Sequence, residues 1–220
     1  MDENIVEMGN VYLDSAKGDE IFRNLNFSLK SGRTAIITGG PGSGKTSFVE
    51  MVVGRQFAKS GSVEVFGQII KPGRRGIVNK VRRQIGGVGG IFELIPSYTI
   101  AQNISFPIVV AAKSKKYRHE RTLKMLTEFS LINRAGDYPD DLTRVQKTLA
   151  LFARASVANQ PLIIIDEPSA GMDQSTSERI FKYLHDVSMS GLSMIILGSE
   201  KIKYDLPNTD YYEFKNGTME

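Results

Sequence analysis

The sequence contains no cysteine, which excludes disulfide bonds, thiolate metal sites and cysteine nucleophiles. Any catalysis must therefore use oxygen or nitrogen groups. The longest apolar runs, such as 107–112 and 162–165, are far shorter than the ~20 residues that cross a bilayer, so the chain itself is not expected to span a membrane. The first residues are acidic where a secretory signal needs positive charge and an apolar run, so a cytoplasmic location is expected.

Internal repeats, low-complexity tracts and long linkers rich in Pro, Gly or Ser are also absent. The chain has 220 residues, of which 41% are apolar and 24% are charged. Such a composition supplies enough apolar side chains for one sizeable core. We therefore expect one compact domain.

The net charge of +4 is small, but cations gather in two stretches. One holds Lys71, Arg74, Arg75, Lys80, Arg82 and Arg83, and the other holds Lys113, Lys115, Lys116, Arg118 and Arg121. A solvated face is the common meaning of such runs, and a surface facing anionic lipid headgroups or nucleic acid is the alternative. Neither run is interleaved with the aromatic residues that stack on single-stranded bases, so nucleic acid is the weaker alternative.

Short strand patterns alternate with helical ones along the chain. Strands are predicted at 34–38, 62–66, 162–165 and 194–197, with a hairpin formed by 211–214 and the turn Asn216-Gly217. Helical patterns follow the first strand, fill about 98–160 with Leu123, Leu126 and Phe129 as a candidate core face, and return after a capping box of Ser175 and Glu178. This alternation predicts an α/β fold whose parallel sheet is covered on both sides, with a helical insertion.

A phosphate-binding loop is predicted directly after the strand at 34–38. It reads Gly39, Gly40, Pro41, Gly42, Ser43, Gly44, Lys45, Thr46 and Ser47, and its first eight residues fit G-x-x-x-x-G-K-[ST] between a strand and a helix. Glycines let backbone N–H groups wrap around phosphate, and the helix adds its positive N-terminal end. Lys45 supplies charge to the β and γ phosphates, and the Thr46 hydroxyl is a ligand for Mg²⁺.

The predicted strand 162–165 delivers two carboxylates, Asp166 and Glu167, at its C-terminal end. Ligands bind at this end of the strands in open α/β sheets. We expect Asp166 to reach Mg²⁺ through water and Glu167 to polarise the water that attacks the γ phosphate. Alone, such a strand end could simply be solvated, but the phosphate-binding loop upstream favours the catalytic interpretation.

These residues resemble the nucleotide-binding subunit of an ABC (ATP-binding cassette) transporter. The stretch 166–173 resembles the family's Walker B and D-loop motifs, which makes Asp173 the D-loop aspartate at a dimer interface. Residues 99–103 resemble the start of the family's helical subdomain, 138–142 the approach to its signature, and 152–155 the helix after it. The resemblance covers nearly the whole chain, from 21–25 to 214–217.

The resemblance implies a P-loop NTPase (RecA-like) core with a mainly parallel sheet, a small antiparallel β region and an inserted helical subdomain. It implies one domain over 1–220, with 1–90 and 161–220 as the core and 91–160 as the helical subdomain. ATP and Mg²⁺ would be the cofactors. The partners would be a transmembrane transporter subunit and a second cassette, in a homodimer or heterodimer, at the inner face of the membrane, and no nucleic acid is expected.

The chain departs from the family at the signature. In place of Leu-Ser-Gly-Gly-Gln it has Leu142-Thr143-Arg144-Val145-Gln146. Thr143 retains the hydroxyl and can cap a helix. Arg144 and Val145 carry bulky side chains at the two glycine positions of the family motif, where the backbone has to approach a phosphate closely. The contact across the dimer is therefore in question, and Arg144 is either a surface arginine or a positive charge directed at phosphate.

The switch histidine of the family also has no counterpart at the expected place, which reads Gly198-Ser199-Glu200. Only His119 and His185 exist, and both fall in helical or charged segments. We expect Ser199 to stand where the switch histidine would be.

Two further elements differ from the family pattern. Gly90 stands at the place of the Q-loop glutamine, since Gln84 comes too early and Glu93 is the nearest polar residue downstream. For the aromatic residue that stacks on adenine, Ser15 aligns best and Tyr12 lies three residues away.

Three functions are compatible with this sequence. The first is an active ATPase that drives a transmembrane partner, supported by the retained Lys45, Asp166 and Glu167. The second is an ATP-binding subunit with little or no hydrolysis, acting as the regulatory or structural half of a heterodimer. The third is a soluble ABC-type ATPase acting on nucleic acid or a protein assembly. A P-loop kinase or GTPase fits less well, because the D-loop and the helical insertion would then be coincidences.

Overall fold

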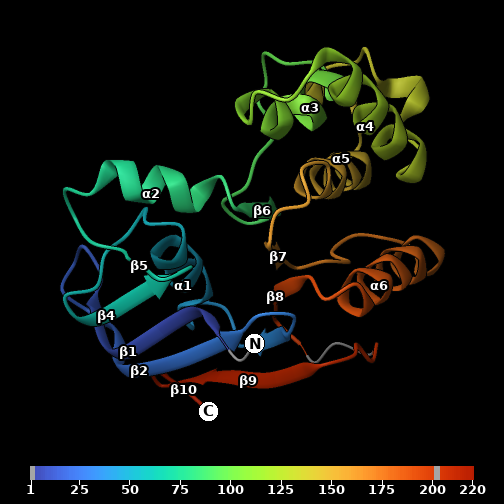
Figure 1. The fold of residues 1–220 in the computed structure, drawn as a ribbon. Helices are drawn as coiled ribbons and strands as arrows, with labels where there is room; N and C mark the ends of the chain where they lie inside the picture. Colours follow the sequence, from blue (N-terminus) through green and yellow to red (C-terminus); the bar gives the residue numbers. More distant parts are fainter. Residues whose placement is uncertain (1–2, 201–203) are drawn as a thin grey trace.

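The computed structural model describes residues 3–200 and 204–220. Strands β1 (Asn4–Asp14), β2 (Glu20–Lys30), β4 (Ser60–Val65) and β5 (Gln68–Ile69) form an antiparallel sheet in the order β2-β1-β4-β5 (Figure 1). A second sheet has the order β10-β9-β3-β8-β7-β6. It contains β3 (Thr34–Thr38), β6 (Ile85–Val88), β7 (Leu162–Asp166), β8 (Ser193–Gly198), β9 (Thr209–Lys215) and β10 (Thr218–Met219). Only β10 runs antiparallel there, so the mainly parallel sheet and the terminal hairpin are confirmed.

The helices fall into two groups. Helices α1 (Lys45–Val52) and α2 (Arg75–Arg82) lie beside the antiparallel sheet, and α6 (Gln174–Met189) connects β7 to β8 (Figure 1). Helices α3 (Ile100–Val110), α4 (Lys115–Glu128) and α5 (Arg144–Ser156) are inserted between β6 and β7, with two 3₁₀ turns at Ile132–Arg134 and Pro139–Asp141. The predicted helical insertion is confirmed. No helix of the described residues combines the length and apolar character needed to cross a membrane.

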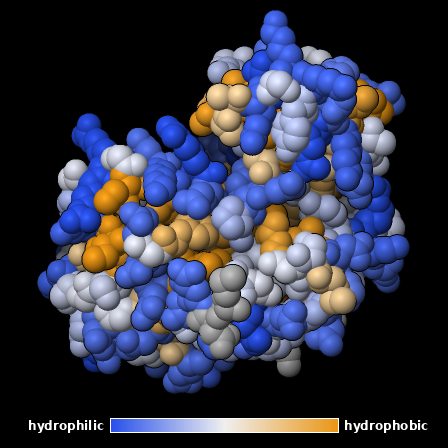
Figure 2. All heavy atoms as spheres, in the orientation of Figure 1, coloured by the Kyte–Doolittle hydropathy of each residue, from blue (hydrophilic) through white to orange (hydrophobic). Residues whose placement is uncertain are grey.

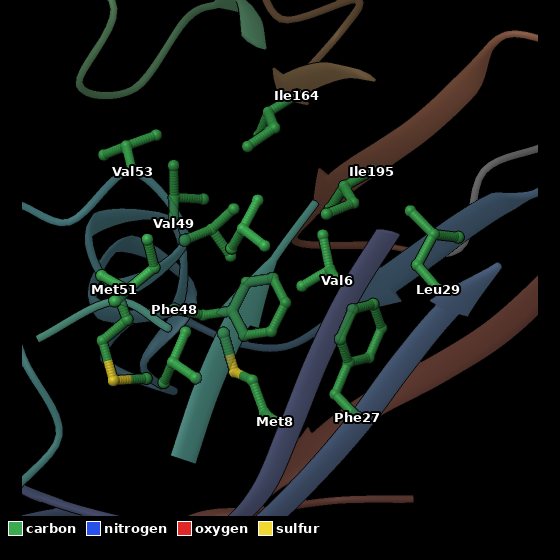
Figure 3. Close-up of a cluster of buried hydrophobic side chains, with 14 of the residues drawn as sticks. Val6, Met8, Phe27, Leu29, Phe48, Val49, Met51, Val53, Ile164 and Ile195 are labelled. Carbon is green, nitrogen blue, oxygen red and sulfur yellow. The ribbon is translucent and has the colours of Figure 1, made fainter. Parts of the chain in front are cut away.

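The central strands are apolar throughout because both of their faces are covered. Ile164 of β7 and Ile195 of β8 belong to a core shared with Phe27 and Phe48, whose rings meet edge to face at 5.0 Å (Figure 3). The neighbouring residues on the same strands, such as Ile163, belong to a second core under α3 to α6. Successive side chains of a strand point to opposite faces, so a strand between two layers must be apolar at every position.

One expected core face in the helical insertion is partly wrong. Leu126 and Phe129 are buried as predicted, but Leu123 is 45% exposed. Buried positions on α4 include Thr122 and Met125 instead. The predicted positions are each three residues apart, and such positions move progressively around a helix. The buried positions on α4 follow the spacing i, i+3, i+4 and i+7, starting at Thr122, which leaves Leu123 outside the buried face.

The predicted capping box at the start of α6 is also wrong. The helix begins at Gln174 and is capped by Asp173, whose carboxylate accepts a hydrogen bond from the Thr176 N–H at 2.9 Å. Glu178 instead accepts from the Gln174 side chain, and the Ser175 hydroxyl donates to Asp173. Aspartate and serine are about equally good caps, but Asp173 has the extended backbone that a capping residue needs, so the helix starts before Ser175.

Candidate nucleotide-binding site

The loop 39–44 joins the C-terminal end of β3 to α1, the position expected for a phosphate-binding loop. Phe48 provides the first N–H of α1 that bonds within the helix, to the Gly44 carbonyl at 2.9 Å, and no side chain caps the helix. The N–H groups of the first turn, including those of Lys45 and Thr46, thus point out of the helix without an intrahelical partner. Together with the helix dipole they suit an anion.

The shape of this loop requires glycine at two positions. Gly44 has φ 102°, and a Cβ on it would lie 2.6 Å from the Phe22 ring. A Cβ on Gly39 would lie 2.5 Å from the Ser43 hydroxyl, which is itself buried and lacks a hydrogen-bond partner in the described structure. Buried hydroxyls are normally paired, so this one fits a loop that wraps a polar ligand.

Lys45 folds back over the loop. Its ammonium donates to the carbonyl oxygens of Gly39 and, at 3.2 Å, of Gly40. Both acceptors are neutral carbonyls, whereas a phosphate oxygen carries negative charge and adds a charge–charge attraction to the hydrogen bond. A phosphate in the loop would therefore compete well for this ammonium.

Asp166 and Glu167 stand at the end of β7, close to Lys45. Burial, and next the charge of Glu167, raise the pKa of Asp166, while the Lys45 charge opposes them. Glu167 has the left-handed φ of 54°, and its N–H donates to the Leu197 carbonyl of β8 at 2.9 Å. This conformation is uncommon for a residue other than glycine and turns the chain sharply at the strand end. Two neighbouring carboxylates that repel each other suit a divalent cation, so Mg²⁺ fits these residues.

A double glycine after β6 lies against Asp166. A Cβ on Gly90 would be 2.3 Å from the Asp166 Oδ2 atom, and a Cβ on Gly89 would be 2.4 Å from the Asp166 backbone oxygen. Both glycines have positive φ, 73° for Gly89 and 54° for Gly90. At the position of the family's Q-loop glutamine, the backbone of Gly90 therefore lies directly against the Asp166 carboxylate. Sequence reasoning noticed Gly90 but missed this contact.

The segment at the signature position forms the start of α5. The Thr143 hydroxyl accepts from the Gln146 N–H at 3.3 Å, and the Gln146 side chain accepts from the Thr143 N–H at 2.9 Å. The helix cap predicted for Thr143 is confirmed. Arg144 extends toward the loop after β7, where its Cδ lies 3.8 Å from the position of a Cβ on Gly171. This contact within one chain carried no sequence signal, because the two residues are far apart along the chain.

A hollow of about 800 Å³ opens beside the phosphate-binding loop. Its lining includes Gly39 and Gly40 on one side, and Ser199 and Glu200, which follow β8, on another. The structure thus brings Ser199 next to the loop. His119 lies on α4, and His185 lies on α6 beside Asp186, so neither histidine follows β8.

The two candidate positions for adenine stacking differ in their contacts. The Ser15 hydroxyl accepts from the N–H groups of Lys17 at 3.2 Å and Asp19 at 3.1 Å, so it holds its own turn between β1 and β2. Tyr12, near the end of β1, is 37% exposed. Tyr12 is therefore the accessible aromatic side chain of the two.

Known proteins share this architecture. The family model described as ABC transporter matches residues 22–170. The lipoprotein-releasing system ATP-binding protein LolD of Buchnera aphidicola is 28% identical over 184 residues, which cover 83% of this chain and 81% of that protein. The cell division ATP-binding protein FtsE of Bacillus subtilis is 25% identical over 197 residues, which cover 90% and 86%.

A solved structure of a dimeric ATP-binding cassette, in a post-hydrolysis state bound to ADP and Pi, is also similar. It is 25% identical and has a TM-score of 0.85, with coverage of 98% of this chain and 96% of that one. The family model spans more than half of the chain, and the order of strands and helices agrees with a cassette fold. The chain therefore belongs to the ABC transporter family and is an ATP-binding subunit of an ABC transporter complex.

Proposed function

We propose that this chain hydrolyses ATP and couples that reaction to a transmembrane partner, as a peripheral subunit at the inner face of the membrane. The observation that carries the proposal is the proximity of Lys45 to Asp166 and Glu167 at the C-terminal ends of β3 and β7. Within the chain, 1–90 and 161–220 would form the nucleotide-binding core and 91–160 the helical subdomain. The dimeric relative bound to ADP and Pi supports a working dimer of cassettes.

Each part of the site has a role in this proposal. The loop 39–47 binds the phosphates of ATP through its backbone and through Lys45. The Thr46 hydroxyl and Asp166 would hold Mg²⁺, which neutralises charge on the β and γ phosphates when bound. Glu167 accepts the proton of the water that attacks the γ phosphate. Its sharp backbone turn, held by the bond to Leu197, keeps the carboxyl group at the strand end.

A second candidate is an ATP-binding subunit with little or no hydrolysis, paired with a complete cassette. Its support is the set of altered motifs, since Arg144, Gly90 and Ser199 replace residues that the family pattern uses. The Arg144 side chain lies beside Gly171 in the loop after β7 of its own chain, which favours a role other than closing a partner's site. A homodimer would carry these changes in both sites.

Phosphate release by the purified protein, measured over a series of protein concentrations with Mg-ATP, separates the two candidates. We expect the specific activity to rise with concentration and then level off, because the active form is a dimer. Tight ATP binding with no phosphate release at any concentration would favour the second candidate. Absence of both binding and release would contradict the nucleotide site itself.

Replacing Gly90 with alanine tests whether the close approach of the Gly90 backbone holds the Asp166 carboxyl group in place. The new Cβ would lie 2.3 Å from the Asp166 Oδ2 atom, so the carboxyl group must rotate. We expect the Mg²⁺ concentration needed for half-maximal nucleotide binding to rise by about tenfold or more, as for lost outer-shell contacts at metal sites. A Mg²⁺ titration with a fluorescent ATP analogue measures this.

Gly67→Ala is the matched control for Gly90→Ala. Gly67 also has a positive φ, 67°, but a Cβ on it would meet no atom within 4 Å. It therefore reports the backbone strain alone, without the contact to Asp166. An equal Mg²⁺ dependence in the two variants would contradict the role of the Gly90 contact.

A further inference from the structure

Charge is strongly segregated along this chain. Residues 65–119 contain ten lysines and arginines and a single carboxylate, Glu93, whereas the remaining residues contain eighteen cations and twenty-three carboxylates. Figure 1 shows that α2 and the helices α3 and α4, which lie in or next to this segment, stand on the same side of the molecule. The hairpin β9–β10 and the C-terminus lie on the opposite side.

Among the described residues, no carboxylate forms an ion pair with the exposed cations on and around α2. We call Lys71, Arg74, Arg75, Lys80 and Arg83 the α2 basic face; all five are exposed. The buried side of the helix consists of Val78 and Val81, which anchor it to the core. The face is thus held rigidly and directed outward.

Three more arginines add uncompensated charge next to this face. Arg55, Arg82 and Arg154 line a cavity of about 240 Å³ beside β6. In the described part of the chain, their hydrogen bonds go to backbone carbonyls alone, namely those of Ile91, Val53, Gly54 and Glu93. Burial lowers the pKa of Arg154 to about 10. The positive potential therefore extends from α2 toward the helical insertion.

An exposed apolar strip on the helical insertion accompanies the charge. Phe106, Val109 and Val110 of α3 are between 37% and 44% exposed, and Phe106 packs edge-on against the exposed Tyr98. In the space-filling view, hydrophilic residues cover the top of the lobe that carries α2, and hydrophobic residues are visible both below them and on the helical lobe across the notch (Figure 2). Cations beside exposed aromatic and aliphatic groups form the pattern of surfaces that lie on a membrane interface.

We propose that the α2 basic face binds anionic lipid headgroups, so that this side of the chain lies against a membrane surface. The inference rests on the proposed function only for the expectation that the chain works at a membrane. The β9–β10 hairpin on the opposite side would be repelled by the same lipids, because residues 204–220 contain four carboxylates and one cation, and this repulsion orients the molecule. Each cation near an anionic membrane surface contributes about a fivefold factor in binding.

A nucleic acid is the other polyanion that such a face could bind, but the structure favours the lipid surface. Residues 71–83, which carry the α2 basic face, contain no aromatic side chain, so single-stranded bases have no stacking platform between its cations. A membrane surface is broad enough to meet both these cations and the exposed rings of Tyr98 and Phe106 on the helical insertion. The α2 helix is also short, with eight residues, and its basic face is broad rather than a groove that follows a strand.

Sedimentation with vesicles tests the proposal on the full chain. Vesicles of phosphatidylcholine alone are compared with vesicles that also contain phosphatidylglycerol, at low and at high salt. We expect binding only to the anionic vesicles, and loss of it at high salt. In the variant Arg74→Gln/Arg75→Gln/Lys80→Gln, binding should weaken by on the order of 10- to 100-fold.

The matched control removes three cations elsewhere, as Lys17→Gln/Lys182→Gln/Lys215→Gln. These lysines lie in the β1–β2 turn, on α6 and at the end of β9. We expect the control to bind anionic vesicles like the unchanged protein. Equal weakening in both triple variants would overturn the proposal, because net charge and not the α2 face would then decide binding.

Two further outcomes would also overturn it. The first is vesicle binding that does not depend on phosphatidylglycerol. The second is tighter binding of a duplex RNA than of anionic vesicles to the α2 basic face. Mg-ATP binding, measured on every variant, separates this proposal from the proposed function. Lys45→Ala should lose Mg-ATP binding and still bind anionic vesicles. The α2 triple variant should bind Mg-ATP and bind anionic vesicles more weakly. If the α2 triple variant failed to fold, the proposal would still be tested by whether vesicle binding of the unchanged protein requires phosphatidylglycerol and is lost at high salt.

Discussion

Replacing Lys45 with alanine is expected to weaken Mg-ATP binding by about 100-fold or more and to abolish hydrolysis. A hydrogen bond to a charged group contributes roughly 1.5–3 kcal/mol, and the Lys45 ammonium would serve two phosphate groups. The fold should survive, because the hydrogen bonds of the Lys45 ammonium within the described residues go to the carbonyls of Gly39 and Gly40, which water can solvate in the variant. Fluorescent-nucleotide titration measures the affinity, and circular dichroism checks the fold.

Lys17→Ala is the control for this experiment, since it removes an exposed lysine from the β1–β2 turn. It should bind Mg-ATP as the unchanged protein does. Nucleotide affinity that is the same in Lys45→Ala and Lys17→Ala would refute the assignment of loop 39–47 to phosphate.

Glu167→Gln is expected to keep nucleotide binding and to lower the turnover rate by about 10²- to 10⁴-fold, the usual contribution of a general base. Glutamine has the shape of glutamate but cannot accept a proton from water at neutral pH. The backbone at this position is set by φ 54° and by the bond from its N–H to Leu197, neither of which depends on the side-chain charge. Single-turnover phosphate release and nucleotide titration, run side by side, measure the two effects.

The control for this variant is Glu178→Gln, which removes an exposed carboxylate on α6 that accepts a hydrogen bond from the Gln174 side chain. Its turnover should match that of the unchanged protein. If Glu167→Gln also retained full turnover, another group would have to activate the water, and the assigned role of Glu167 would fail.

Sequence patterns predicted the parts of this fold that depend on local residue order. The continuous apolar strands at β7 and β8 and the turn Asn216-Gly217 were found because burial on both faces and tight turns leave a clear signal in neighbouring residues. The loop 39–44 lies between a strand and a helix as its spelling indicates. The roles of its residues, and those of Asp166 and Glu167, stay predictions until the variants above are measured.

The errors arose where two local signals competed. Asp173 caps α6 in place of the predicted Ser175, because a carboxylate at the right backbone angle captures the first free N–H groups. Leu123 is exposed because its spacing drifts off the buried stripe of α4. Both errors displace the predicted residue by one or two positions along a helix.

The sequence by itself determined the alternation of the central strands and helices, the glycine-rich loop between β3 and α1, and the family, because these follow from neighbouring residues and their spacing. Only the tertiary structure decided which distant residues touch. It placed Gly90 against the Asp166 carboxylate, Arg144 beside Gly171, and the cations of the α2 basic face on the side of the helical insertion. The physical reason is that each of these contacts joins segments far apart along the chain, whose approach is set by how the layers pack and not by any local pattern.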